Sequence, residues 1–246
     1  MVGPPRQTIA QEVTARLREL ILRGEYQAGD KLPPERQLAD SLGVNRATVR
    51  EALKNLEQAG LVRIRQGDGT RVQDFLQTAG LDLLAHLLSL GETTAVSILK
   101  DILEFRQIFG REVARLAARR ATVEQLERLE LITARTAGSP DEALVQDLDF
   151  YVELARAGHN VLFVLLLNPV KETVRRFSGF FANFNPSVGE VRAHQHQVIA
   201  AIRARDADAA ASAADHHLQR GKEHLLGRLE RSAGAEVLAR PKDAEQ

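Results

Sequence analysis

Residues 35–54, ERQLADSLGVNRATVREALK, have the spacing of two short helices that cross at a tight turn. Such a crossing needs a small residue where the backbones approach, a glycine where the chain reverses, and a branched apolar residue beneath the second helix. Ala39, Gly43 and Val49 stand at the fifth, ninth and fifteenth places of the stretch. The pattern therefore predicts a helix-turn-helix.

The second helix of this motif is expected to turn its polar residues away from the core. Arg46 and Arg50 are four residues apart and share a face, and an arginine fork can bind the O6 and N7 edge of guanine. Asn45 and Thr48 add short polar groups near the helix start, where recognition helices contact bases or phosphates. We expect this helix to read DNA, the alternative being a solvated surface rich in arginine.

A second DNA-binding element is expected directly behind this helix, at residues 61–73. Two short β-prone runs flank the turn QGDG, which predicts a β-hairpin in the position of a wing. Gln66 and Arg71 flank its tip, and Gly67 allows the backbone to approach a groove or a phosphate. A plain connecting hairpin is the alternative.

Beyond the hairpin no strand pattern recurs, and the remaining chain predicts a helical bundle. The segments with helical spacing are 74–90, 94–120, 122–136, 140–157, 160–184, 187–204 and 206–233. We therefore expect a mainly α protein with a winged helix-turn-helix domain at 1–73, an all-α antiparallel bundle of about seven helices at 74–235 and a frayed tail at 236–246.

Charge and composition restrict the partners. Residues 1–73 contain 12 Lys or Arg and 9 Asp or Glu, whereas the rest contain 21 and 24, so the basic end carries the motif. No apolar run approaches the ~20 residues that span a bilayer, which predicts no membrane partner. There is no cysteine and no secretory signal pattern, so we expect a cytoplasmic location.

Two parts of the chain resemble a known family. The stretch 20–72, LILRGEYQAGDKLPPERQLADSLGVNRATVREALKNLEQAGLVRIRQGDGTRV, resembles the amino-terminal domain of GntR-family bacterial transcription regulators. ILEFRQIFGREVARLAARRAT at 102, DLDFY at 147 and IAAIRARDADAAASAADHHL at 199 resemble the FadR-type effector domain, called FCD. The resemblance implies a homodimeric repressor that binds a palindromic operator through its winged domains and responds to a small molecule in the bundle.

The resemblance also implies which residues contact DNA. They lie before and on the recognition helix and at the wing tip: Arg36, Arg46, Arg50, Gln66 and Gly67, with Asn45 and Thr48 at neighbouring contact positions.

The effector pocket departs from the family pattern. Many relatives hold a divalent metal between an aspartate, a histidine four residues later and two further histidines. Asp147 and His217 match the first and last positions, while Tyr151 and Gln195 stand in the second and third. One carboxylate and one imidazole make a weak metal site, so we expect no bound metal.

Histidines beside the third position keep the metal alternative open. His194 and His196 flank Gln195, but adjacent helical residues are about 100° apart, so neither is expected to take over its direction. If that register is displaced by one residue, a metal-dependent organic-acid sensor becomes the alternative. A solvated helix surface is a further interpretation of the same histidines.

Other residues point to an acidic or acyl-type ligand. Arg106 matches a family arginine that points into the bundle, the alternative being an ordinary interhelical salt bridge. The segment 165–186 is similar to that of the metal-free, acyl-CoA-responsive branch, and Arg176 is a candidate for its pocket mouth. Phenylalanines in this region are candidates for either core or ligand contact: Phe163, Phe177, Phe180, Phe181 and Phe184.

The sequence also bears on two other classes of protein. An enzyme is not expected, because no nucleophile elbow, phosphate loop or HExxH motif accompanies the polar residues of the bundle. A DNA-architectural protein without a ligand would need a tightly filled bundle, whereas a cavity lined by Arg106, Tyr151 and Gln195 would argue against it.

Overall fold

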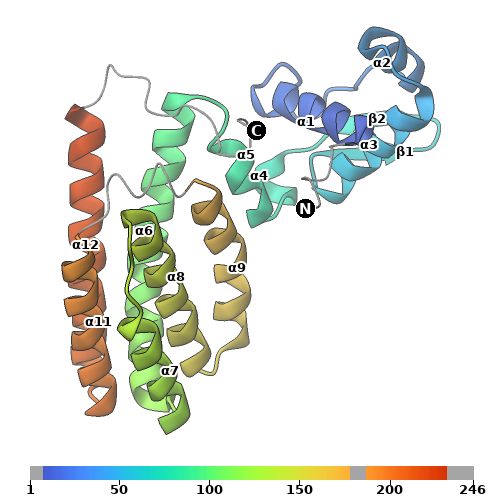
Figure 1. Cartoon of the computed structure of the whole chain (residues 1–246). Helices are drawn as coiled ribbons and strands as arrows, with labels where there is room; N and C mark the ends of the chain where they lie inside the picture. The colour runs from blue at the N-terminus through green and yellow to red at the C-terminus, as the bar shows by residue number, and fades with distance from the viewer. Residues whose placement is uncertain (1–7, 178–186, 232–246) are drawn as a thin grey trace, which may run out of the picture. The chain divides into compact units, whose positions relative to one another are not determined.

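The computed structural model describes residues 8–177 and 187–231. Contacts divide the chain into two compact units, Met1–Leu90 and Gly91–Gln246, each with its own buried core. The fold is mainly α-helical, as expected, with a single two-stranded sheet among the described residues (Figure 1). Within the described ranges, no helix combines the length and the apolar character needed to cross a bilayer.

The first unit begins with three helices, α1 (Ile9–Leu22), α2 (Glu35–Leu42) and α3 (Arg46–Gln58). Thr8 starts α1 with a capping box, in which its side chain and that of Gln11 each accept from the other's backbone N–H. Gly43 ends α2 at φ 66°, a left-handed conformation that glycine adopts easily, and Val49 on the inner face of α3 is fully buried. The predicted helix-turn-helix is confirmed.

The hairpin follows α3, with strands β1 (Val62–Arg65) and β2 (Gly69–Val72). The strands are antiparallel, and Val62 lies opposite Val72. Lys31 forms an isolated bridge with Arg71, so the chain between α1 and α2 lies beside β2. The predicted wing is therefore present, with an extra extended piece along one edge.

Residues 74–90 differ from the single helix expected there. They form the short helix α4 (Phe75–Thr78), the 3-10 helix η1 (Leu81–Leu83) and the short helix α5 (Leu84–Leu87). Ala79 and Gly80 are extended, with ψ 157° and −178°, and this interrupts the helical run.

This segment is attached to the end of the recognition helix. Thr78 Oγ1 donates to the carbonyl of Gly60 at 2.6 Å, and a Cβ on Gly60 would overlap the Thr78 carbonyl oxygen. Leu83 is buried in the core of the first unit. By its contacts the first unit thus extends to Leu90, whereas the sequence placed the boundary after Gln73.

The second unit is a bundle of six long helices among the described residues: α6 (Glu92–Arg120), α7 (Val123–Ala134), α8 (Pro140–Ala157), α9 (Val161–Arg176), α11 (Val188–Arg203) and α12 (Ala207–Arg231). α6 packs against α8, α11 and α12, and α8 also contacts α7 and α9 (Figure 1). The predicted end of the helix from 160, with Phe180, Phe181 and Phe184, lies outside the described residues, as does the tail 236–246.

Small residues allow α6 and α12 to approach closely. Ala114, Ala117 and Ala118 on α6 and Ala210 and Ala214 on α12 are fully buried in the same core cluster. Alanine combines high helix propensity with little bulk, so it suits such a contact.

Gly110 marks the tightest approach of α6 to its neighbours. A Cβ at this position would overlap Leu218 Cδ1 of α12 and would lie 2.9 Å from Tyr151 Cε1 of α8. Leu218 can change rotamer, but Tyr151 is buried, and moving its ring would disturb the hydrogen bond between its hydroxyl and His194. Any side chain larger than hydrogen at this position would therefore require the tyrosine ring to move.

We predict that Gly110→Ala lowers the free energy of unfolding of the helical unit by about 1 to 2 kcal/mol, because overpacking outweighs the gain in helix propensity. Gly221→Ala is the matched control, since Gly221 lies in α12 with no atom within 4 Å of an added Cβ. It should stabilise by up to about 1 kcal/mol. Urea unfolding followed by circular dichroism measures both, and equal stabilisation by the two substitutions would contradict the tight approach.

Candidate functional site

The recognition helix α3 exposes the two arginines expected to face DNA. Arg46 and Arg50 are exposed, whereas Val49 between them is buried. Asn45 caps the helix, its Oδ1 accepting from the Thr48 N–H at 2.8 Å. Asn45 therefore has a structural role in addition to the DNA contact proposed for it.

Arg50 is held by an acidic residue of α2. Its Nε donates to Glu35 Oε1 at 3.1 Å and its Nη2 donates to Glu35 Oε2 at 2.8 Å. The hydrogen bond from Arg50 lowers the pKa of the Glu35 carboxyl, so both groups are charged at neutral pH. Arg36, by contrast, is largely exposed and lies 3.9 Å from Asp40.

At the wing tip the backbone and the amide side chain of Gln66 are open to solvent, whereas one of the cations, Arg71, is paired within the protein. Gln66 and Gly67 are exposed, and Gly67 has φ 84°. Arg71 instead donates to both carboxylate oxygens of Asp68, at 2.7 and 3.0 Å, and to the carbonyl of Gly29 at 3.1 Å. Arg71 thus connects the hairpin to the chain between α1 and α2 and neutralises the acidic residue of the turn.

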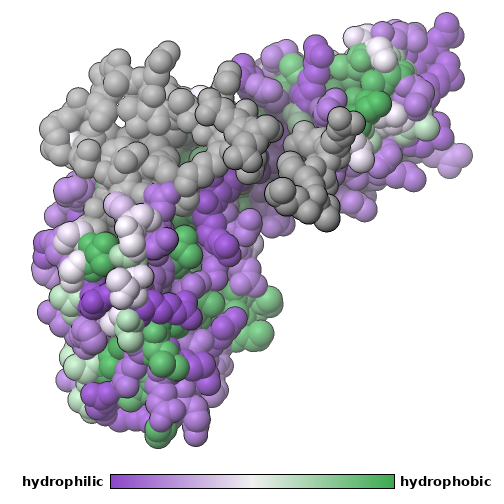
Figure 2. All heavy atoms as spheres, in the orientation of Figure 1, coloured by the Kyte–Doolittle hydropathy of each residue, from purple (hydrophilic) through white to green (hydrophobic). Residues whose placement is uncertain are grey.

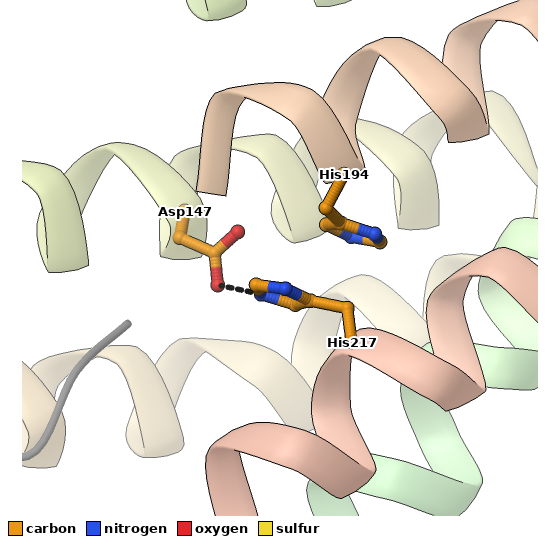
Figure 3. A group of neighbouring side chains, drawn as sticks. All are labelled: Asp147, His194 and His217. Carbon is orange, nitrogen blue, oxygen red and sulfur yellow. Dashed lines mark ion pairs between the residues drawn. The ribbon is translucent and has the colours of Figure 1, made fainter. Parts of the chain in front are cut away.

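A buried polar cluster lies in the second unit and is contributed by four helices: Arg106 of α6, Asp147 and Tyr151 of α8, His194 and Gln195 of α11, and His217 of α12. Asp147 has no exposed surface. Its carboxylate accepts from Arg106 Nη2 at 2.5 Å and from Gln195 Nε2 at 3.3 Å, and His217 Nε2 lies 3.7 Å away (Figure 3). These groups compensate a charge that would otherwise be costly to bury.

His194 belongs to this cluster as well, beside Gln195, which keeps the position expected for it against Asp147. Its ring stacks on His217, with centroids 3.8 Å apart and an angle of 3° (Figure 3), and its Nε2 lies 3.1 Å from the hydroxyl of Tyr151. α11 packs against both α8 and α12, so its two adjacent residues enter the cluster in different directions. Neither neighbour takes over the direction of Gln195, but His194 enters the cluster from a second direction that the sequence did not predict, whereas His196 is exposed.

The protonation states follow from burial and charge. Burial alone would raise the pKa of Asp147, but His217, Arg106 and His194 together hold it well below its ordinary value. Burial lowers the pKa of His194 to about 3 and raises that of Tyr151. At neutral pH the tyrosine hydroxyl therefore keeps its proton, the His194 imidazole is neutral, and the two groups share one hydrogen bond.

An apolar cavity of about 50 Å³ adjoins the cluster, between α6, α8 and α9. Arg106 and Tyr151 belong to both the cavity wall and the cluster. Most of the remaining wall is aliphatic or aromatic: Leu103, Phe109, Leu148, Leu167, Val170 and Val174. The volume suffices for a few waters or a small ligand, and a larger ligand would have to enlarge it.

The cation that α9 contributes to the cavity is Lys171, not Arg176. Lys171 Nζ lies 2.6 Å from Asp149 Oδ1, while Arg176 is exposed in the last turn of α9. Sequence reasoning missed Lys171, although its position between Val170 and Val174 was a usable signal. Gln195 was also expected in the cavity wall, but it does not line the cavity. It is hydrogen-bonded to Asp147 within the cluster.

The cluster fits a divalent cation in the number and type of its donors. Asp147, His194 and His217 offer a carboxylate oxygen and two imidazole nitrogens, all within 4.8 Å of one another. Gln195 Oε1 is buried without a hydrogen-bond partner among the described residues, so it is a further oxygen donor. Arg106 opposes a second cation, because its guanidinium contacts the same carboxylate.

Comparisons with known proteins match both units. Residues 9–72 match the bacterial regulatory proteins of the gntR family, and residues 101–220 match the FCD domain. The chain is 39% identical over 166 residues to the HTH-type transcriptional regulator Mce2R of Mycobacterium tuberculosis, covering 66% of this chain and 69% of the relative. It is 35% identical to a putative L-lactate dehydrogenase operon regulatory protein of Escherichia coli, covering 89% and 86%.

A solved structure supports the fold. Lar, which controls the expression of the Listeria monocytogenes agr system, matches with a TM-score of 0.55 and 18% identity, covering 91% of this chain and 99% of that one. With a helix-turn-helix, a wing and a helical unit in place, the chain belongs to the gntR family of bacterial regulatory proteins with an FCD domain, and it is a DNA-binding transcription regulator rather than an enzyme.

Proposed function

We propose that this regulator is a homodimeric repressor. Its affinity for a palindromic operator is controlled by a small organic acid that binds in the helical unit. A repressor acts where the chromosome lies, which in bacteria is the cytoplasm. The observation that carries the ligand proposal is the position of Arg106, which lines the apolar cavity and also contacts the buried Asp147.

Arg106 is suited to hold the acid group. A guanidinium can bind a carboxylate through two parallel hydrogen bonds, and in the free protein only its Nη2 is bonded to Asp147. The apolar walls favour an acid with a hydrocarbon body, which includes acyl-type ligands. Such a ligand shifts the DNA-binding equilibrium only as far as it prefers one arrangement of the helices over another.

We predict that short and medium-chain carboxylates raise the melting temperature of the protein, because a ligand that binds only the folded state stabilises it. Arg106→Gln should abolish the shift, but it leaves Asp147 buried without its cation, which costs about 3 to 5 kcal/mol. The double variant Arg106→Gln/Asp147→Asn removes both charges and should fold while still failing to respond.

Arg111→Gln is the control for this test, since Arg111 is an exposed arginine of the same helix. A thermal-shift series over chain length measures all three variants. An undiminished response of the double variant would place the acid elsewhere.

A second candidate is a metal-dependent sensor, favoured by the donor set of Asp147, His194 and His217. FCD domains are often metal-associated. In this chain Tyr151 stands in the second position of the family pattern and Arg106 lies against the carboxylate, so a cation would need Arg106 to move. A bound metal would supply a further positive charge for an acidic ligand.

We predict that protein purified without chelator contains no stoichiometric Zn, Mn or Ni by elemental analysis, because Arg106 already neutralises Asp147. If one equivalent is found, His194→Asn should remove it, whereas His196→Asn should not, since His196 is exposed. Metal retained by His194→Asn would show that the cluster is not its site.

DNA reading is proposed to rest on Arg46 and Arg50 of the recognition helix, with Arg36 and the wing tip at Gln66 and Gly67 positioning the unit. Each well-formed arginine contact to guanine supplies about 1 to 3 kcal/mol of discrimination. A dimer doubles the set, so its preferred sites should be inverted repeats.

We predict that the full-length protein selects inverted repeats from a pool of random-sequence duplexes, and that Arg46→Ala lowers affinity for the selected sites much more than affinity for random DNA. Arg16→Ala, which removes the same charge from α1, should affect both equally or not at all. Equal losses for Arg46→Ala on selected and random DNA would show that Arg46 contacts only phosphates.

A further inference from the structure

The Glu35–Arg50 pair joins the two helices of the helix-turn-helix by a specific geometry. The carboxylate binds the side of the guanidinium formed by Nε and Nη2, at 3.1 and 2.8 Å. A guanidinium has five N–H groups in one plane, so three remain: two on Nη1 and one on Nη2. The edge formed by Nη1 and Nη2 is therefore complete, and it is a fork of the kind that matches guanine O6 and N7.

We infer that Glu35 is a specificity-determining residue, which holds Arg50 so that this outer edge of its guanidinium meets a guanine. The inference rests on the proposed role of Arg50 in base reading and adds a residue that need not touch DNA itself. A preorganised fork loses less side-chain entropy on binding than a free arginine, which can reach bases and phosphates alike.

The elements beneath the pair are rigid. Glu35 is the first residue of α2, where the helix dipole favours a carboxylate and where Pro34 restricts the backbone. Arg50 follows Val49, whose side chain is fully buried. Both ends of the ion pair are thus attached to backbone that the core holds in place.

Stability does not explain the pair. Its side chains are 60% exposed for Arg50 and 36% exposed for Glu35, and ion pairs so accessible to water contribute little to folding. A negative charge in a DNA-binding unit also opposes binding to every phosphate backbone. A residue that adds little stability and weakens general affinity is best accounted for by what it does to Arg50.

A second acid–arginine pair on α2 provides a matched control. Asp40 lies 3.9 Å from Arg36, and both side chains are about three-quarters exposed, at 75% and 76%. Asp40→Asn removes the same charge from the same helix as Glu35→Gln. It does not disturb a hydrogen-bonded fork, because at that distance none is formed.

The test selects bound sequences from a random-sequence duplex pool with the full-length wild-type protein, Glu35→Gln, Asp40→Asn and Arg50→Ala. We expect Glu35→Gln to lose at least about fivefold in preference at one base pair of each half-site, the lower end of what one arginine–guanine contact supplies. Arg50→Ala should lose preference at the same base pair. Affinity of Glu35→Gln for unselected DNA should be unchanged or higher, and Asp40→Asn should keep the wild-type preference.

Glu35→Asp separates charge from reach, because it keeps the carboxylate but shortens the side chain. We expect it to lose base preference while its affinity for unselected DNA stays at the wild-type level. Unchanged melting temperatures would show that all variants are folded.

The outcomes distinguish the inference from the function on which it rests. If Arg50→Ala loses the base preference and Glu35→Gln keeps it, the role of Glu35 is overturned and base reading by Arg50 stands. If Arg50→Ala also keeps the preference, Arg50 does not read a base, and both proposals fail. If Asp40→Asn and Glu35→Gln lost the base preference equally, the effect would come from the change in net charge, and the inference would be overturned.

Discussion

An ionised carboxylate without solvent contact must be compensated from within the protein, and the carboxylate of Asp147 is in that situation. Its partners come from three other helices, with Arg106 on α6, Gln195 on α11 and His217 on α12. One buried charge therefore ties four helices of the second unit together. Removing a single partner from such an arrangement costs far more than an exposed ion pair does.

The same arrangement connects the proposed effector site to the buried charge. Arg106 is shared between Asp147 and the cavity wall, so a ligand that engages the guanidinium changes the balance of charges around the carboxylate. Tyr151 is shared in the same way through its hydrogen bond to His194. Contact with a ligand would thereby reach α11 and α12, which do not line the cavity.

Charge is used differently on the DNA-binding unit. The Glu35–Arg50 pair is open to solvent, and Arg71 is turned back onto Asp68, so neither contributes much to stability. Each pair instead orients its arginine, so that a defined set of N–H donors remains at the surface. Figure 2 shows hydrophilic residues over most of the visible face of this unit, in contrast to the apolar atoms over α9, where Val161, Leu162 and Leu165 are exposed.

Most helices and strands could be predicted, because the residues that determine them are close together in the sequence. Gly43 and Val49 fixed the helix crossing, and Asp147 and His217 were found in the cluster by spacing within recognisable segments. His194 was named only as part of an alternative, because the choice between adjacent residues of α11 depends on how that helix is rotated against α8 and α12.

Features that join distant parts of the chain could not be predicted. The contact of Glu35 with Arg50 depends on the crossing angle of two helices, and the role of Lys171 on which side of α9 faces the cavity. Residues 74–90 looked helical by composition, but the extended backbone at Gly80 breaks the run.

The contact between Gly60 and Thr78 leaves no room for adjustment between two segments of the backbone. Gly60 has φ 73°, and a Cβ at this position would overlap the peptide group of Thr78, so any other amino acid would have to displace the backbone of one segment from the other. The residue stands between the last turn of α3 and strand β1. A displacement of residues 79–90 would therefore act directly on the backbone between the recognition helix and the wing.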